Sequence, residues 1–305
     1  MNANYLDAVR LLLAVAPAVF RDPLFALKGG TAINLFVRDM PRLSVDLDLV
    51  IADHTTNRDE VLAMVSAALG AVREELTGFG FRSEMGATAE GSETKLFIER
   101  ARTRIKVEVN HVFRGTILPV EGRALTPSAQ DTFFTDIEVP VLHPDELYGS
   151  KLVAAMDRQH PRDWFDVLGL FEQGGLTPGI VECFVCYLAG HNRPVHEVLF
   201  ANMIGIAPAY ANEFAGMSRE PVSLGELEET RRRLFAELPA ALSNHQRAFL
   251  SGLVKGEPDW SLMSCAHLSD MPAIRWKLEN LARLKRSSPE KFARQATDLE
   301  AKLGG

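Results

Sequence analysis

The sequence has few cysteines, no apolar run long enough to cross a membrane, and no excess of positive charge. Three cysteines in 305 residues, an odd number, argue against the disulfide framework of a secreted protein. The apolar stretch LLLAVAPAVF is shorter than the roughly 20 residues that span a bilayer. It continues without a cleavage site into LFALKGG. We therefore expect a cytoplasmic protein with no membrane partner.

The formal net charge of −7 is unusual for a nucleic-acid binder, which is generally basic at least locally. Residues 271–305, called the basic tail below, depart from this average. Either the tail is a solvated helix surface, or it contacts an RNA backbone. Its basic residues are Arg275, Lys277, Arg283, Lys285, Arg286, Lys291, Arg294 and Lys302, and its acidic residues are Glu279, Glu290, Asp298 and Glu300.

Hydrophobic periodicity divides the chain into a mixed region and a helical region. The pattern predicts an α+β domain over residues 1–143, with a mixed β-sheet and flanking helices. It predicts an all-α domain over residues 144–305. The sequence shows no repeat and no low-complexity tract. The expected helices of the first region are 6–20, 31–37 and 58–76, and its expected strands are 25–28, 46–51, 79–84, 95–101, 104–113 and 136–142.

The stretch from Gly29 to Leu49 carries the strongest chemical signal. Gly29, Gly30 and Thr31 follow an apolar strand and precede a helix, an arrangement in which backbone amides can approach phosphate closely. Asp46 and Asp48 lie two residues apart on the next strand, so their side chains project from one face. Two like charges on one face repel, and Mg²⁺ or Mn²⁺ bound by oxygen ligands would relieve the repulsion. The stretch predicts nucleotide chemistry.

This pattern resembles the signature of the nucleotidyltransferase superfamily. The strings LKGGTAINLF and RLSVDLDLV are similar to those of its AbiEii/AbiGii toxin branch, which includes the MenT-type toxins. A second string, KLVAAMDRQHPRDWFD at residues 151–166, is similar to the KLxAxxxRxxxRDxxD element of that branch. The resemblance implies the nucleotidyltransferase fold and metal-dependent transfer of a nucleotide from an NTP. It also implies a type IV toxin–antitoxin system with an antitoxin protein, and tRNA 3′ ends as acceptor in MenT-like members.

The resemblance further implies a third carboxylate on a neighbouring strand, and Glu108 holds the matching position. The strand 104–110 alternates, with Ile105, Val107 and Val109 on one face and Glu108 on the other. The superfamily often has Asp there, so Glu is a variation. The alternative is an ordinary half-exposed strand, because alternation by itself places polar residues on that face.

Lys151 and the acids of RDWFD become functional through the same resemblance. Lys151 would neutralise triphosphate charge, with Arg158 on nearly the same helix face. Pro161 is suited to begin a new helix with Asp163 in its first turn, where an acid also complements the helix dipole. Either Asp163 or Asp166 would orient the lysine or the nucleotide, and their spacing does not separate them.

Other candidates have two interpretations each. Ser44 shares the face of the two aspartates and could contact phosphate, or it is a hydroxyl at the start of a strand. Arg42 is a phosphate contact or a surface charge. Cys183, Cys186, His191 and His196 suggest zinc by residue type. We favour apolar packing of the cysteines, because the surrounding run is apolar and the finger spacing is missing.

The sequence thus predicts a Mg²⁺-dependent nucleotidyltransferase. The expected metal ligands are Asp46, Asp48 and Glu108; the expected further catalytic residues are Lys151, Asp163 and Asp166; the expected nucleotide contacts are Gly29, Gly30, Thr31, Arg42, Ser44 and Arg158. The expected acceptor is tRNA. The alternatives are a transferase that modifies a small molecule such as an antibiotic, and a non-catalytic nucleotide-binding module.

Overall fold

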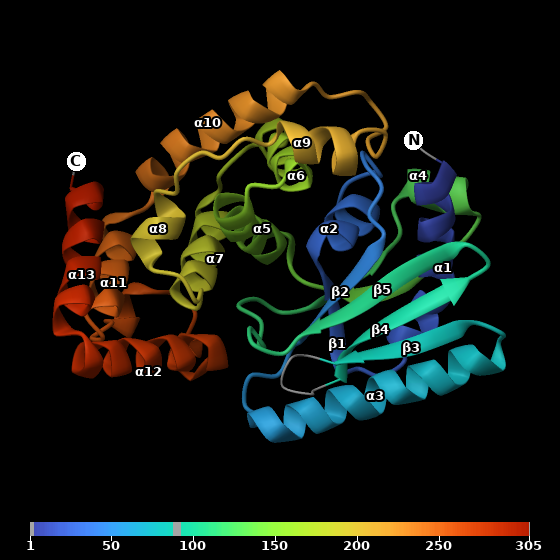
Figure 1. Cartoon of the computed structure of the whole chain (residues 1–305), viewed down its shortest axis with the longest axis horizontal. Helices are drawn as coiled ribbons and strands as arrows, with labels where there is room; N and C mark the ends of the chain where they lie inside the picture. Colours follow the sequence, from blue (N-terminus) through green and yellow to red (C-terminus); the bar gives the residue numbers. More distant parts are fainter. Residues whose placement is uncertain (1–2, 88–92, 305) are drawn as a thin grey trace. The chain divides into compact units, whose positions relative to one another are not determined.

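The computed structural model describes residues 3–87 and 93–304 (Figure 1). The chain divides into two compact units. The first comprises residues 1–147 and 215–221, and the second comprises residues 148–214 and 222–305. The sequence-based boundary was placed after residue 143, and it did not include the segment 215–221. That segment joins the first unit through backbone contacts, among them a hydrogen bond from the Leu43 amide to the Met217 carbonyl at 2.9 Å.

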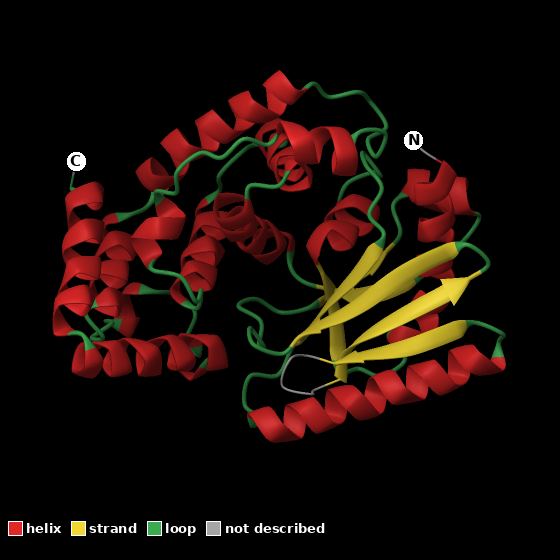
Figure 2. Cartoon of the chain, viewed as in Figure 1, coloured by secondary structure: helices red, strands yellow, loops and turns green. Residues whose placement is uncertain are grey.

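The first unit contains a seven-stranded mixed sheet, whose strands are yellow in Figure 2. The strand order is β3-β4-β5-β2-β1-β7-β6. β2 pairs in parallel with β5, and β1 in parallel with β7, whereas the remaining pairs are antiparallel. The expected mixed sheet is therefore confirmed. The strands are β1 (Phe25–Lys28), β2 (Asp46–Ile51), β3 (Arg82–Ala87), β4 (Glu93–Arg100), β5 (Thr103–Asn110), β6 (Glu121–Ala124) and β7 (Glu138–Val141).

Strand alternation places apolar and polar side chains on opposite faces, as predicted. On β2, Leu47 and Leu49 are 1% and 0% exposed, while Asp46 and Asp48 are half-buried. On β5, the residues Ile105, Val107 and Val109 are all buried. The buried face packs against helices, with α1 (Ala3–Val19) on β5 and α3 (Arg58–Gly78) on β3 and β4 (Figure 1).

Several predictions of elements and their bounds were wrong in this unit. The strand expected at 104–113 ends at Asn110. The strand expected at 79–84 begins at Arg82, because α3 continues to Gly78 and a turn at Gly80 with φ +80° follows it. The short strand β6 and the helix α4 (Pro127–Phe133) were not predicted. The helix expected at 31–37 consists of α2 (Gly29–Ala32) and a π-helical segment, Ile33–Val37.

All regular elements among the described residues of the second unit are helices, which confirms the expected all-α region. Several begin with proline, whose fixed φ suits the first helical position, and Ser223 and Ser243 form capping boxes. No helix among the described residues has the length and apolar character to cross a bilayer. The helices are α5 (Pro144–Arg158), which begins in the first unit, α6 (Pro161–Glu172), α7 (Pro178–Ala189), α8 (Val195–Leu199), α9 (Ala207–Ala209), the π-helical Tyr210–Phe214, α10 (Leu224–Ala241), α11 (Asn244–Val254), α12 (Pro272–Ser287) and α13 (Pro289–Leu303), with short 3₁₀ turns at Trp260–Leu262 and Leu268–Asp270.

Candidate active site

The turn between β1 and α2 brings backbone directly against a carboxylate. Gly29 begins α2 with φ +76°, a conformation that favours glycine. A Cβ at Gly29 would lie 2.5 Å from Oδ2 of Asp48. Lys28 holds the N-cap position, and its side chain does not cap the helix. Glycine is therefore required at this position both by its backbone conformation and by its contact with Asp48.

Gly30 packs against the segment that leads into β2. A Cβ there would lie 2.7 Å from Nη2 of Arg42 and 3.0 Å from Oγ of Ser44. Arg42 is 2% exposed, and its guanidinium donates a hydrogen bond to the Leu43 carbonyl at 3.0 Å. Arg42 is thus a buried residue beside the turn, so the surface-charge interpretation was wrong. Its predicted phosphate contact, like that of Ser44, stays a prediction.

Thr31 links the turn to the aspartate strand. Its residue is 1% exposed, and its hydroxyl donates to the backbone carbonyl of Asp46 at 2.5 Å. This hydrogen bond fixes the turn relative to the first aspartate. The predicted contact of Thr31 with phosphate stays a prediction, and the structure shows that its hydroxyl already has a partner.

The strand register gathers charged residues on one face of the sheet. Asp48 is paired with Glu108 on β5 and with Lys28 on β1, and Asp46 is paired with Lys106 on β5. Directly paired residues in a sheet lie on the same face. The structure therefore brings Asp46, Asp48 and Glu108 to neighbouring positions, as the sequence analysis expected.

Glu108 accepts hydrogen bonds from two lysines. Lys106 Nζ lies 2.6 Å from its Oε2, and Lys95 Nζ lies 2.9 Å from its Oε1. Burial disfavours the charged carboxylate, but the hydrogen bonds and charges of the two lysines outweigh that effect and lower the pKa of Glu108. Among the residues that the structure describes, no three His, Cys, Asp or Glu side chains converge as a metal-binding group. Both carboxylate oxygens of Glu108 instead accept hydrogen bonds from the ammonium groups of Lys95 and Lys106.

Lys106 is surrounded by acids. Burial disfavours its ammonium form, but the hydrogen bond to Glu108 and the charges of Asp46, Glu108 and Asp48 outweigh it and raise the pKa of Lys106. Lys106 is therefore a firmly charged cation at the face that carries the two aspartates. The sequence analysis gave it no role, although alternation in the string RIKVEVN places it on the same face as Glu108.

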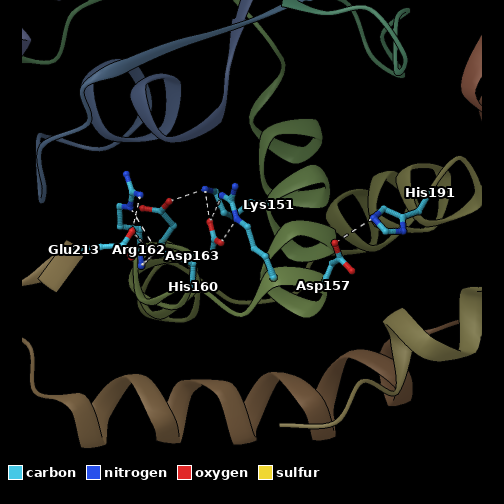
Figure 3. Close-up of polar contacts among 9 residues, drawn as sticks. Lys151, Asp157, His160, Arg162, Asp163, His191 and Glu213 are labelled. Carbon is cyan, nitrogen blue, oxygen red and sulfur yellow. Dashed lines mark hydrogen bonds and ion pairs between the residues drawn. The ribbon is translucent and has the colours of Figure 1, made fainter. Parts of the chain in front are cut away.

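In the helical unit, Lys151 lies between two buried acids, and Figure 3 shows it beside one of them, Asp163. Its Nζ is 3.0 Å from Oδ1 of Asp163 and 3.0 Å from Oδ2 of Asp166. The lysine side chain is 6% exposed and both aspartate side chains are 0% exposed. Both acids of the RDWFD string therefore form ion pairs with Lys151. The spacing left open which of the two orients the lysine, and the structure shows that both contact it.

Arg158 completes this cluster from the end of α5. It contacts Asp163 through Nε at 2.5 Å and Nη2 at 2.7 Å. Burial raises the cost of the Asp163 charge, but the positive charges of Lys151 and Arg158 and their hydrogen bonds hold its pKa well below its usual range. The Arg158 side chain is 60% exposed, so part of it stays accessible. Its predicted nucleotide contact, and that of Lys151, stay predictions.

The turn between α5 and α6 explains how the second motif forms this cluster. Gln159, the residue after the end of α5, adopts φ +51°. His160 is the N-cap of α6, with its Nδ1 accepting from the Arg162 amide at 3.2 Å. The predicted helix start at Pro161, with Asp163 in the first turn, is confirmed. His160 Nε2 also lies 3.1 Å from Glu213 (Figure 3), a contact that local sequence does not indicate.

The cysteine–histidine group does not assemble into one site. Cys183 and Cys186 are 1% and 0% exposed on α7, which confirms that they pack as apolar side chains. His191 Nε2 lies 3.5 Å from Asp157 (Figure 3), and His196 Nε2 lies 3.7 Å from Asp298. Each histidine therefore contacts a carboxylate of its own.

Comparison with known proteins agrees with this geometry. A family model described as "Nucleotidyl transferase AbiEii toxin, Type IV TA system" matches residues 10–280. No curated protein matches the chain. A similar solved structure is MenT4, a nucleotidyltransferase toxin from Mycobacterium tuberculosis H37Rv, with a TM-score of 0.60 and 20% sequence identity over 90% of this chain and 95% of that chain. This likeness shows a shared fold and confirms the expected fold class. The family match shows more: the chain belongs to the AbiEii nucleotidyltransferase toxin family.

Proposed function

We propose that this nucleotidyltransferase transfers a nucleoside monophosphate from an NTP to the 3′ end of tRNA, with Mg²⁺ as its metal. The observation that carries the proposal is the contact between the glycine turn and the aspartate strand. Asp46 and Asp48 project from one face of β2, and Gly29 leaves no room for a side chain between the backbone and Asp48. Backbone amides and carboxylates are thus held side by side, as binding of a metal–triphosphate requires.

The donor set of this face suits the proposed metal. The carboxylate oxygens of Asp46 and Asp48 are hard ligands of the type that Mg²⁺ and Mn²⁺ prefer. Both residues are half-buried, so they are accessible without being fully solvated. Bound at these residues, a divalent ion would supply charge neutralisation for the phosphates and activation of the acceptor hydroxyl.

The chain's own residues have three tasks in this reaction. The amides of Gly29 and Gly30 bind phosphate oxygens. The carboxylate face orients the nucleotide for in-line attack and accepts the proton of the acceptor hydroxyl. The hydroxyl oxygen forms a bond to the α-phosphorus as the bond from that phosphorus to the bridging oxygen breaks, and pyrophosphate leaves.

The toxin family supplies the biological setting of the proposal. We propose that a cognate antitoxin protein restrains the enzyme, and that the reaction takes place in the cytoplasm, where NTPs and tRNA occur together. Induced expression in bacteria is expected to arrest growth, and the Asp48→Asn variant is expected to be harmless.

The test is transfer of label from each α-labelled NTP to total tRNA in the presence of Mg²⁺. Labelled tRNA is expected with at least one NTP, and a chelator should abolish the labelling. Periodate-oxidised tRNA, which lacks the terminal hydroxyls, is the matched control and should stay unlabelled. Labelling of a small molecule instead of RNA would favour an antibiotic-type transferase. Nucleotide binding without any transfer would favour a non-catalytic module.

A further inference from the structure

Three lysines and three carboxylates form a balanced charge cluster on one face of the sheet. In register across the strands lie Lys28, Asp48, Glu108 and Lys95, and in the adjacent row lie Asp46 and Lys106. Of these, Lys95 and Lys106 are the partners of Glu108, each on a different carboxylate oxygen. The side chains of Lys95, Lys106 and Glu108 are 35%, 31% and 32% exposed. Their ion pairs are thus partly shielded from solvent.

This arrangement has a consequence for any cation that approaches the face. A divalent ion that used Glu108 would have to replace ammonium groups at both of its oxygens. It would also meet the positive charge of Lys106, which the fields of Asp46 and Asp48 already stabilise. An NTP changes this balance, because its phosphates are alternative partners for the lysines and bring additional oxygen ligands for the metal.

We propose that Lys95 and Lys106 are positioning residues that hold Glu108 away from the metal until nucleotide binds. Free metal then binds the nucleotide-free protein weakly, through Asp46 and Asp48 alone, and metal and NTP bind together. When the phosphates of the NTP pair with the lysines, Glu108 loses these partners and can bind the metal as the third carboxylate. This proposal rests on the proposed function, since it assigns an order of binding to the same site.

The experiment is a calorimetric titration of Mn²⁺ into the nucleotide-free protein, without RNA. The double variant Lys95→Met/Lys106→Met is expected to bind Mn²⁺ about tenfold more tightly than the wild type, because Glu108 is released. Adding Glu108→Gln to the double variant should remove this gain. Lys106→Arg preserves the ion pair and should retain wild-type affinity. Lys255→Met removes a lysine of the second unit that pairs with Glu300, and it should leave the affinity unchanged.

Two results with the lysine variants would overturn the proposal. One is a Mn²⁺ affinity that does not rise in the double variant. The other is a rise that persists after Glu108→Gln, which would mean that only the general charge of the face had changed. If the double variant does not fold, the single variant Lys106→Gln is carried through the same cycle with Glu108→Gln. Asp48→Asn must weaken Mn²⁺ binding in every background, because otherwise the ion binds elsewhere and the proposal fails.

The titration is independent of transfer activity. Absence of labelled RNA would refute the proposed acceptor and would leave the Mn²⁺ pattern as predicted. Conversely, a normal transfer reaction together with Mn²⁺ affinities that do not depend on Glu108 would refute the role of the lysines and leave the proposed function intact.

Discussion

A Cβ at Gly29 would lie 2.5 Å from Oδ2 of Asp48, and Gly29 itself has a positive φ of 76°. Gly29→Ala is therefore expected to displace Asp48 and to strain the turn, at a cost of about 1–2 kcal/mol for the left-handed conformation. Displacement of the Asp48 carboxylate should reduce the transfer rate by about 100-fold. Transfer rates and the free energy of unfolding from urea titration measure the two effects.

Gly70 provides the matched control for this substitution. It lies within α3, and a Cβ there would meet nothing within 4 Å. Gly70→Ala should stabilise the protein by about 0.5–1 kcal/mol through helix propensity and leave transfer unchanged. Wild-type transfer by Gly29→Ala would show that the close approach of the turn to Asp48 has no role in the reaction.

Lys151→Ala should destabilise the protein and change its acid sensitivity. The substitution leaves two fully buried aspartates with less positive charge around them, which costs about 3–5 kcal/mol. The pKa of Asp163 is depressed in the folded protein, so its contribution to stability is present above the unfolded pKa of about 3.9 and is lost as the pH falls through the folded value. Acid unfolding of the variant should therefore begin at a higher pH than that of the wild type.

The predicted triphosphate contact of Lys151 needs a second measurement, because unfolding alone would reduce binding. Under conditions where the variant is folded, Lys151→Ala should weaken triphosphate binding more than monophosphate binding. Asp166→Asn removes one of the lysine's partners and serves as a comparison. An equal loss for both nucleotides in a calorimetric titration would be incompatible with this contact.

Burial of Lys277 makes the stability of the protein depend on pH in the alkaline range. Its side chain is buried, and burial lowers the pKa of Lys277 to about 8, against about 10.4 in the unfolded chain. Between these values the unfolded chain binds more protons, so this lysine makes stability rise with pH. Urea titrations from pH 7 to 10.5 should show this rise in the wild type and a smaller one in Lys277→Met. Parallel profiles would contradict the assignment.

The basic tail retains exposed cations that suit an RNA backbone. Arg283, Lys285 and Arg286 are exposed on α12, and the Arg283 guanidinium lies 5.9 Å from the ring centroid of the half-exposed Trp276. Lys277 does not belong to this surface, because its ammonium donates to the carbonyls of His191 and Arg193. The interpretation of the basic tail as a solvated helix surface was therefore wrong for Lys277.

Neutralising Arg283, Lys285 and Arg286 to Gln should weaken RNA modification and spare NTP binding. Each lost phosphate contact should reduce the slope of log affinity against log salt by roughly 0.7–0.9. Arg232→Gln/Arg233→Gln is the control, since these arginines already pair with Glu229 and Glu237. A triple variant that modifies tRNA at the wild-type rate across a salt series would exclude the tail as the RNA contact.

Local sequence was sufficient where a feature depends on periodicity or on glycine and proline. β1 and β2 have the predicted bounds, and α6 begins at the predicted proline. It was insufficient where a feature depends on register between distant segments. The Lys95–Glu108 pair arises from the antiparallel register of β4 and β5, which neither strand specifies by itself.

Two other misses have identifiable causes. The sequence of β6, EGRA, does not alternate between apolar and polar residues. None of its residues is buried, since they alternate only between half-buried and exposed. Lys277 was counted as a surface charge, although it shares a helix face with the buried Ile274 and Leu281. Helical periodicity therefore contained a signal for its burial, and the charge count concealed it.

Transfer by the Asp48→Asn variant tests the central claim most directly. The wild type and the variant are incubated with the α-labelled NTP that the wild type uses, Mg²⁺ and total tRNA, after circular dichroism has shown that both are folded. The substitution removes one half-buried charge on the sheet face that also carries Lys28 and Lys106, so stability should change by no more than about 1 kcal/mol. The account predicts labelled tRNA from the wild type and none from Asp48→Asn. Equal labelling by both proteins would contradict it.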